Sequence, residues 1–175
     1  INLGLDSKIL NQVTGINGDT LSSLVKNSGS IFADGGVVRL DVNAAQDIVD
    51  HMINMDGVIQ ARSVIEENGK IILIGGDEGH VNVSGTLDAS GYNRGETGGE
   101  VNILGKRVGL YGTGFIDISG DSGGGTLLFG GDYQGTGAVP KAMDTYIGPN
   151  TRVFADAINY GDGGKTCLLY TSPSP

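Results

Sequence analysis

The chain has 175 residues, enough for one domain with a hydrophobic core, and 32 of them are glycine, far above the usual share of about 7%. Only 4 residues are proline and no Gly-X-Y triplet recurs, which excludes collagen. The net charge of −9 and the absence of a basic stripe argue against partners such as nucleic acid or anionic lipid. No apolar run reaches the roughly 18 residues of a membrane helix, so we expect no membrane insertion.

A short strand pattern opens each of several repeats: glycine, any residue, an aliphatic residue, any residue, then alanine or another apolar residue. It occurs at 29–33 and returns four times, the last copy without its glycine, with steps of 28, 28, 29 and 37 residues between the central positions. A period of this length is typical of a solenoid, in which equivalent residues lie over one another. We therefore predict two inward columns. They are Ile31, Ile59, Leu87, Ile116 and Val153, and then Ala33, Ala61, Ala89, Ile118 and Ala155.

A second strand pattern follows each copy and consists of a glycine turn and alternating apolar residues. It occurs at 36–40, 69–74, 99–103 and 125–129, and some repeats carry a third strand, as at 81–83. Because no single repeat can bury its apolar face, each strand must pair in parallel with its counterpart one repeat further on. The sequence thus predicts an all-β fold, a parallel β-helix (solenoid) of five to six coils.

One segment departs from the all-β pattern. Apolar residues within 44–53 recur at helical spacing, and Leu21, Leu24 and Val25 repeat part of that pattern 28 residues earlier. We predict a short helix at one corner of the first two coils, although a buried strand would also fit these residues.

The step of 37 residues indicates a surface excursion within 130–149, a segment with two prolines and two tyrosines. Exposed tyrosines can stack on sugars or on partner proteins. If the chain contacts a ligand, we expect the contact in the loop that carries Asp132, Tyr133 and Tyr146.

The predicted β-helix covers residues 1–166. The last nine residues, 167–175, break the repeat and resemble a translated sequencing adapter, so we exclude them from the predicted fold as a non-native tail. The single cysteine, Cys167, belongs to this tail, and no disulfide can form within the chain.

The order and spacing of three glycine-rich motifs resemble the filamentous-haemagglutinin family of exoproteins that are exported by two-partner secretion. The motifs are GTLDASG at 85–91, GGDYQG at 130–135 and the segment 137–149, and the resemblance covers nearly all of residues 10–166. It implies a right-handed β-helix, a fragment of a fibrous passenger that acts in cell adhesion, haemagglutination and virulence. The Asn-Pro-Asn-type motif of the family's secretion domain is absent from this sequence.

The resemblance also implies a location and partners. These are secretion to the extracellular surface of a Gram-negative bacterium, an outer-membrane transporter as export partner, and a glycan or protein of a host-cell or bacterial surface as ligand. No residue of this sequence is assigned to the transporter. We expect a structural stalk or adhesin segment that needs no cofactor and is not an enzyme.

Asp88 and Asp117 raise an alternative, because they occupy the same outward position in successive repeats. Paired carboxylates can act as acid and base on a polysaccharide, as in a lyase-like or hydrolase-like β-helix. No basic residue recurs beside them, and Gln60 and Phe154 take the neighbouring positions. We therefore predict a solvated edge and no catalytic residue.

Clusters of glycine with acidic residues, at Asp77, Glu78 and Asp132, invite a calcium-binding interpretation. A calcium β-roll needs a strict repeat of about nine residues, which these clusters lack. Neither His51 nor His80 has an evident partner ligand. We predict no metal site.

Overall fold

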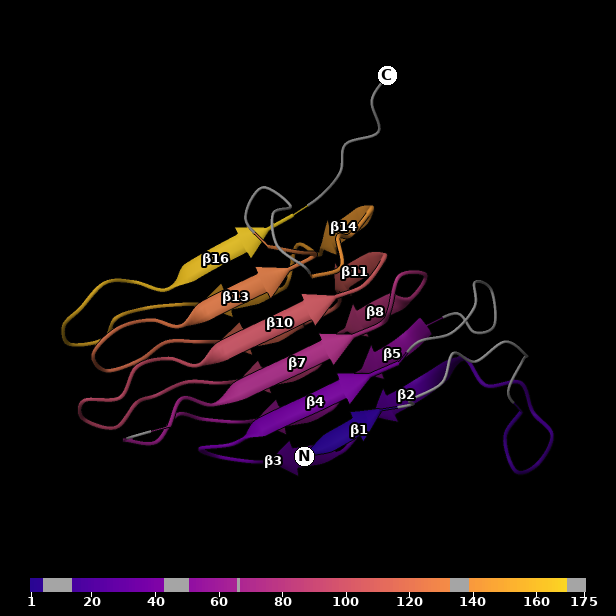
Figure 1. Cartoon of the computed structure of the whole chain (residues 1–175), viewed down its shortest axis with the longest axis horizontal. Helices are drawn as coiled ribbons and strands as arrows, with labels where there is room; N and C mark the ends of the chain where they lie inside the picture. Colours follow the sequence, from indigo (N-terminus) through magenta and orange to yellow (C-terminus); the bar gives the residue numbers. More distant parts are fainter. Residues whose placement is uncertain (5–13, 43–50, 66, 133–138, 170–175) are drawn as a thin grey trace, which may run out of the picture.

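The computed structural model describes residues 1–4, 14–42, 51–65, 67–132 and 139–169. Over these residues the chain forms three parallel sheets and no helix, and therefore no helix that could cross a membrane (Figure 1). The chain visits the three sheets in turn, completes this circuit five times, and then returns to the first sheet with its last strand. This arrangement is the predicted parallel β-helix.

The first sheet has six strands and faces the viewer in Figure 1. In order across the sheet they are β1 (Asn2–Gly4), β4 (Val37–Asp41), β7 (Lys70–Ile74), β10 (Glu100–Leu104), β13 (Thr126–Phe129) and β16 (Lys165–Leu168). The four strands predicted from the glycine-turn pattern are confirmed as β4, β7, β10 and β13. Strand β16 extends into the segment that we excluded, because Cys167 pairs with Leu128 and Leu168 pairs with Phe129. Residues 170–175 lie outside the described residues.

The second sheet has five strands. They are β14 (Asp144–Ile147), β11 (Arg107–Leu110), β8 (His80–Val83), β5 (His51–Met55) and β2 (Ser23–Asn27). The predicted excursion thus contains a strand, since β14 pairs with β11 and places Tyr146 opposite Gly109. The extra residues lie between β13 and β14, and 133–138 are outside the described residues.

The predicted corner helix is wrong wherever the structure describes its residues. Met52 and Ile53 lie in β5, and Val25 lies in β2, with which β5 pairs. Met52 and Ile53 are adjacent and both buried, so both faces of β5 are covered. The turn at Gly79 packs against Met52 so closely that a Cβ added to Gly79 would lie 2.3 Å from Cγ of Met52. Adjacent buried residues break the alternation of a strand and imitate helical spacing. Residues 44–50 lie outside the described residues.

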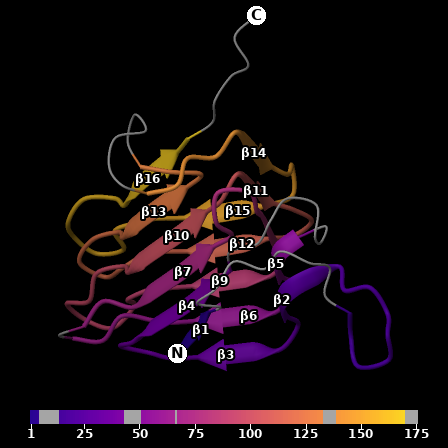
Figure 2. The same cartoon turned by 45° about the vertical axis from the view of Figure 1, so that its right-hand side comes forward.

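The third sheet has five short strands, which Figure 2 shows stacked in register. They are β15 (Arg152–Phe154), β12 (Phe115–Asp117), β9 (Thr86–Asp88), β6 (Val58–Gln60) and β3 (Ser30–Phe32). The central residues of these strands form the first predicted column, because each pairs with the central residue of the next strand. This prediction is confirmed.

The buried apolar residues of the described chain form one hydrophobic core between the three sheets. In the first column Ile59, Leu87 and Ile116 have no exposed surface, and in the second Ala61 and Ala89 are equally buried. Burial of a Leu or Ile side chain contributes about 1.5–3 kcal/mol, so the aliphatic column supplies much of the force that holds successive coils together. Small alanines suit the corner, where the chain turns from the third sheet toward the first.

Candidate functional site

Two buried carboxylates mark the outer face of the third sheet. Asp117 on β12 pairs in register with Asp88 on β9, as the repeat predicts. The predicted solvated edge is wrong, because Asp88 is 9% exposed and Asp117 is 5% exposed. A buried carboxylate must be hydrogen-bonded or paired with a cation, so the groups around each aspartate decide what it can do.

Asp88 is held by a cation and a serine. Arg62 donates from Nε to Oδ2 of Asp88 at 2.8 Å, and its Nη2 lies 2.7 Å from the same oxygen. Ser90 donates to the other oxygen, Oδ1, from its backbone nitrogen at 3.0 Å and from its hydroxyl at 2.6 Å. Burial alone would raise the pKa of Asp88, but the hydrogen bonds from Arg62 and Ser90 outweigh it and hold the pKa below its ordinary value.

The same network continues into the first described coil. The backbone nitrogen of Arg62 donates to Oδ1 of Asp34 at 3.0 Å, and Nε2 of Gln60 donates to both oxygens of Asp34, at 3.0 and 2.8 Å. Arg62 was not predicted, because it does not lie in the outward row that contains Asp88. Gln60 pairs with Asp88 in the next coil, and Arg62 comes two residues after Gln60. The side chain of Arg62 therefore starts from the next outward position of the preceding coil and reaches across to Asp88.

Asp117 is also fully engaged. The hydroxyl of Tyr92 donates to its Oδ2, and the backbone nitrogen of Ser119 donates to its Oδ1 at 2.9 Å. Partial burial and the hydrogen bond to Asp117 raise the pKa of Tyr92 to about 12. Tyr92 is therefore neutral at ordinary pH and acts as a hydrogen-bond donor.

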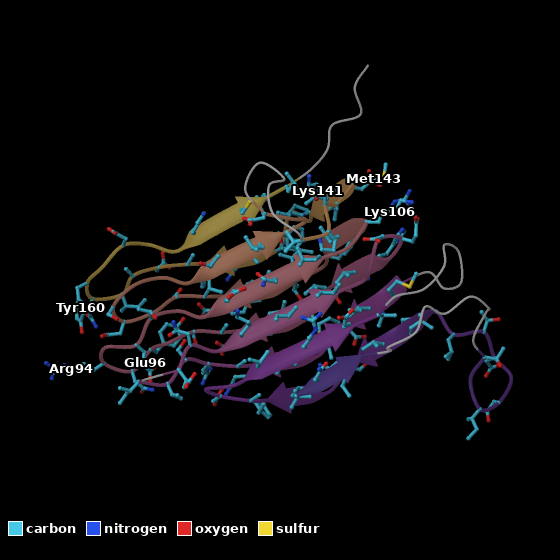
Figure 3. All side chains as sticks on the ribbon, viewed as in Figure 1. Arg94, Glu96, Lys106, Lys141, Met143 and Tyr160 are labelled. Carbon is cyan, nitrogen blue, oxygen red and sulfur yellow. The ribbon has the colours of Figure 1, made fainter. Side chains whose placement is uncertain are left out.

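The turns that follow the third sheet are joined by a further aspartate. Asp121 accepts a hydrogen bond from the backbone nitrogen of Gly95 at 2.7 Å and another from the side chain of Asn159, and these bonds lower its pKa. Figure 3 shows the loop residues Arg94 and Tyr160 at this end of the molecule. Turns of three successive coils are thus linked through one carboxylate.

The chemistry available to this face follows from these contacts. A general acid on a polysaccharide needs a raised pKa, whereas the pKa of Asp88 is lowered. Both oxygens of Asp88 and of Asp117 already accept hydrogen bonds from the protein. A hollow of about 210 Å³ adjoins them, and Arg62, Tyr92 and other polar side chains line it. These contacts link neighbouring coils and do not form an acid–base pair. We call the contact between Arg62 and Asp88 the Asp88 staple.

The predicted ligand-contact residues are placed on different elements. Asp132 is half-buried just after β13, Tyr146 is exposed on β14, and Tyr133 lies outside the described residues. Within the described ranges, no group of three or more His, Cys, Asp or Glu side chains could hold a metal ion. Glu78, from one of the glycine and acidic clusters, forms an ion pair with Lys106 at 2.5 Å.

Substitution of Arg62 tests the role of the Asp88 staple. We expect Arg62→Ala to lower the free energy of unfolding by about 1–2 kcal/mol at pH 7, because it leaves a buried carboxylate without its half-exposed cation. Asp88 has a lowered pKa, so its stabilisation is present above the unfolded pKa of about 3.9 and is lost as the pH falls through the folded value. Denaturant unfolding of both proteins at a series of pH values from 7 downward measures this, and the difference should shrink steadily once the pH falls below about 3.9.

The matched control is Lys26→Ala. Lys26 and Asp56 form an exposed ion pair at 3.7 Å, which should contribute less than about 1 kcal/mol. Equal losses from the two substitutions, or a loss at Arg62 that does not shrink as the pH falls, would contradict the staple.

Comparison of the chain with profiles of known protein families, with curated protein sequences and with solved structures gave no significant match.

Proposed function

We propose that this chain is a rigid stalk segment of a large secreted bacterial surface adhesin. The observation that carries the proposal is the pairing of every described coil with the next in three sheets at once. Each coil adds about 4.8 Å along the stack, and its backbone hydrogen bonds run between neighbouring coils. A stack of this kind resists bending and holds whatever it carries at a fixed distance from its base.

The outer surface supports the same role. Ion pairs join neighbouring coils on more than one face, such as Lys70 with Glu100 at 2.5 Å and Lys106 with Glu78 at 2.5 Å. The acidic net charge of −9 keeps such a rod soluble and discourages side-by-side association. These features fit a spacer outside the cell, where adhesion needs reach and stiffness more than chemistry.

The second candidate is a carbohydrate-active β-helix, and one contact favours it. An enzyme of this class needs a basic residue beside its carboxylates, and Arg62 lies beside Asp88. The engaged oxygens and the lowered pKa of Asp88 weigh against it. Release of reducing ends or of unsaturated sugars from a pectin and glycosaminoglycan panel by the purified chain would establish this candidate and overturn the stalk.

Removal of one whole coil tests the stalk. Deletion of residues 59–86 takes out 28 residues and joins Val58 to Leu87, so Ile31 meets Leu87 in place of Ile59. We place the chain between an outer-membrane anchor and an epitope on bacterial cells and measure the binding of antibody-coated beads. The intact chain should improve bead binding over the anchor alone, and the deletion should keep most of that gain.

The control deletes half a coil, residues 59–72, which places unlike strands beside one another. It should lose the folded stack, seen as a lost thermal transition in the purified protein, and with it the gain in bead binding. If the chain gives no gain in reach over an unstructured linker of equal length, the stalk function is wrong.

A further inference from the structure

A groove runs across three strands on the outer face of the second sheet. It crosses β8, β11 and β14, which lie one above another at the right of Figure 1, and its volume is about 280 Å³. Two rows of outward side chains form its walls, because residues two apart on a strand point to the same side. His80, Arg107 and Asp144 form one wall, and Asn82, Tyr111 and Tyr146 form the other.

The second wall is an aromatic platform. The rings of Tyr111 and Tyr146 stack with their centroids 4.8 Å apart and their planes at 25°. Tyr111 folds back over Gly109, where a Cβ would lie only 1.9 Å from Cε2 of the ring, so glycine at this position makes room for it. The two side chains remain 42% and 48% exposed. Stacked and partly exposed tyrosines offer a flat apolar surface with a hydroxyl at its edge.

The first wall offers hydrogen-bonding groups that balance in charge. Nε of Arg107 lies 2.7 Å from Oδ2 of Asp144, and Nη1 of Arg107 lies 3.2 Å from Nε2 of His80. Both members of the ion pair are more than half exposed, so the pair is weak and its groups can turn toward a ligand at little cost. In the second wall, beside the tyrosines, the amide oxygen of Asn82 is buried and has no hydrogen-bond partner among the described residues. Asparagine rotates easily about its last torsion, and that rotation can turn the amide toward the groove.

We propose that this groove binds a neutral oligosaccharide. A sugar ring has an apolar face that suits the tyrosine platform and a rim of hydroxyl groups that can donate and accept hydrogen bonds along the opposite wall. The groove is near the lower end of the usual size for a small-ligand site, about 300–1,000 Å³, which fits a short stretch of a glycan. The inference rests on the proposed stalk and gives that stalk a contact surface of its own.

The charge of the groove and of the chain favours a neutral sugar over anionic ligands. Arg107 is neutralised by Asp144, so the groove lacks the surplus cation that a sulfated or phosphorylated ligand would require. Nucleic acid could stack on tyrosines, but the net charge of −9 opposes a polyanion. An aromatic or proline-rich peptide could also use the platform, and the experiment must separate it from a sugar.

The test is a titration of the full chain with neutral tetrasaccharides of glucose, galactose, mannose and N-acetylglucosamine. The chain has six tyrosines and no tryptophan, so tyrosine fluorescence includes the two platform rings, and the Tyr111 and Tyr146 variants identify their share of any change. We expect at least one tetrasaccharide to bind. Tyr111→Ala and Tyr146→Ala should each weaken it tenfold or more, whereas Tyr111→Phe, which keeps the ring, should retain most of the affinity. Tyr160→Ala is the matched control, because Tyr160 is an exposed tyrosine in a loop at the other end of the strands (Figure 3).

Each other result overturns the inference in a distinct way. If no tetrasaccharide binds while the coil deletion behaves as a spacer, the groove is not a glycan site and the stalk stands. Equal weakening by Tyr160→Ala and Tyr111→Ala places any binding elsewhere, provided that thermal melting shows both variants folded. Binding of a proline-rich or tyrosine-rich peptide in preference to every sugar assigns the groove to a protein partner. Cleavage of the bound tetrasaccharide rejects the stalk itself.

Discussion

Leu87→Asp is expected to abolish the cooperative thermal transition of this chain. Leu87 has no exposed surface and lies in the first column between Ile59 and Ile116. A carboxylate there would have only aliphatic neighbours in its column, and either its desolvation or its forced protonation costs more than about 4–5 kcal/mol. That is a large part of the 5–15 kcal/mol that typically holds a domain together. Far-UV circular dichroism during thermal melting measures the result.

The control for this substitution is the preceding residue. Thr86 lies on the same strand, points outward and is half-buried, so Thr86→Asp leaves the core intact. We expect it to change the unfolding free energy by less than about 1 kcal/mol. An unchanged β signal and melting curve for Leu87→Asp would mean that this position does not face the core, and the assignment of the column would be wrong.

Gly85→Ala should be almost as damaging, although it adds a single methyl group. A Cβ at Gly85 would lie 1.9 Å from the carbonyl oxygen of Gly57, which belongs to the corner of the preceding coil. Backbone cannot move aside as a side chain can, so one coil must shift away from the next and lose hydrogen bonds and core packing. We expect a loss on the order of 3 kcal/mol, read from denaturant unfolding.

The repeat supplies its own control for the glycine. Gly29 occupies the equivalent corner in the first described coil, and the nearest atom to an added Cβ there is Oδ1 of Asn27 at 3.9 Å. Gly29→Ala should therefore change the free energy of unfolding by no more than about 1 kcal/mol, and a small increase and a small decrease both agree with the prediction. If both alanines cost the same, the requirement for glycine reflects backbone entropy and not the close approach of coils.

Four strands of the first sheet, β4, β7, β10 and β13, and the five strands of the third sheet could be predicted from the sequence because two independent signals agree there. Alternation of apolar residues identifies each strand, and the 28-residue period states which strand pairs with which. Leu87 and Ile116 could be assigned to one column without coordinates for this reason. The second sheet was harder, since Met52 and Ile53 in β5 are adjacent and both buried. Where both faces of a strand are covered, its sequence loses the alternation that separates strand from helix.

The candidate site could be predicted only in part. The stacking of Asp88 on Asp117 follows from the repeat, but the ion pair with Arg62 does not. This ion pair joins two residues that are not at equivalent positions of their coils. It forms because an arginine side chain is long enough to reach the neighbouring coil. The tyrosine platform escaped prediction for a similar reason. Tyr111 and Tyr146 stand at unequal positions of their repeats, and they meet only because one ring folds back over a glycine.

In the described part of the chain, each strand pairs only with strands of the coil above and the coil below, and this makes the cost of damage depend on where it falls. A lesion in β9 divides the five described circuits into two pairs, and a pair is smaller than the three or more repeats that such folds need to persist. The same lesion in β3 or β15 removes an outer layer and leaves four consecutive circuits joined. Among the five described circuits taken by themselves, a lesion is therefore most destabilising in the middle circuit.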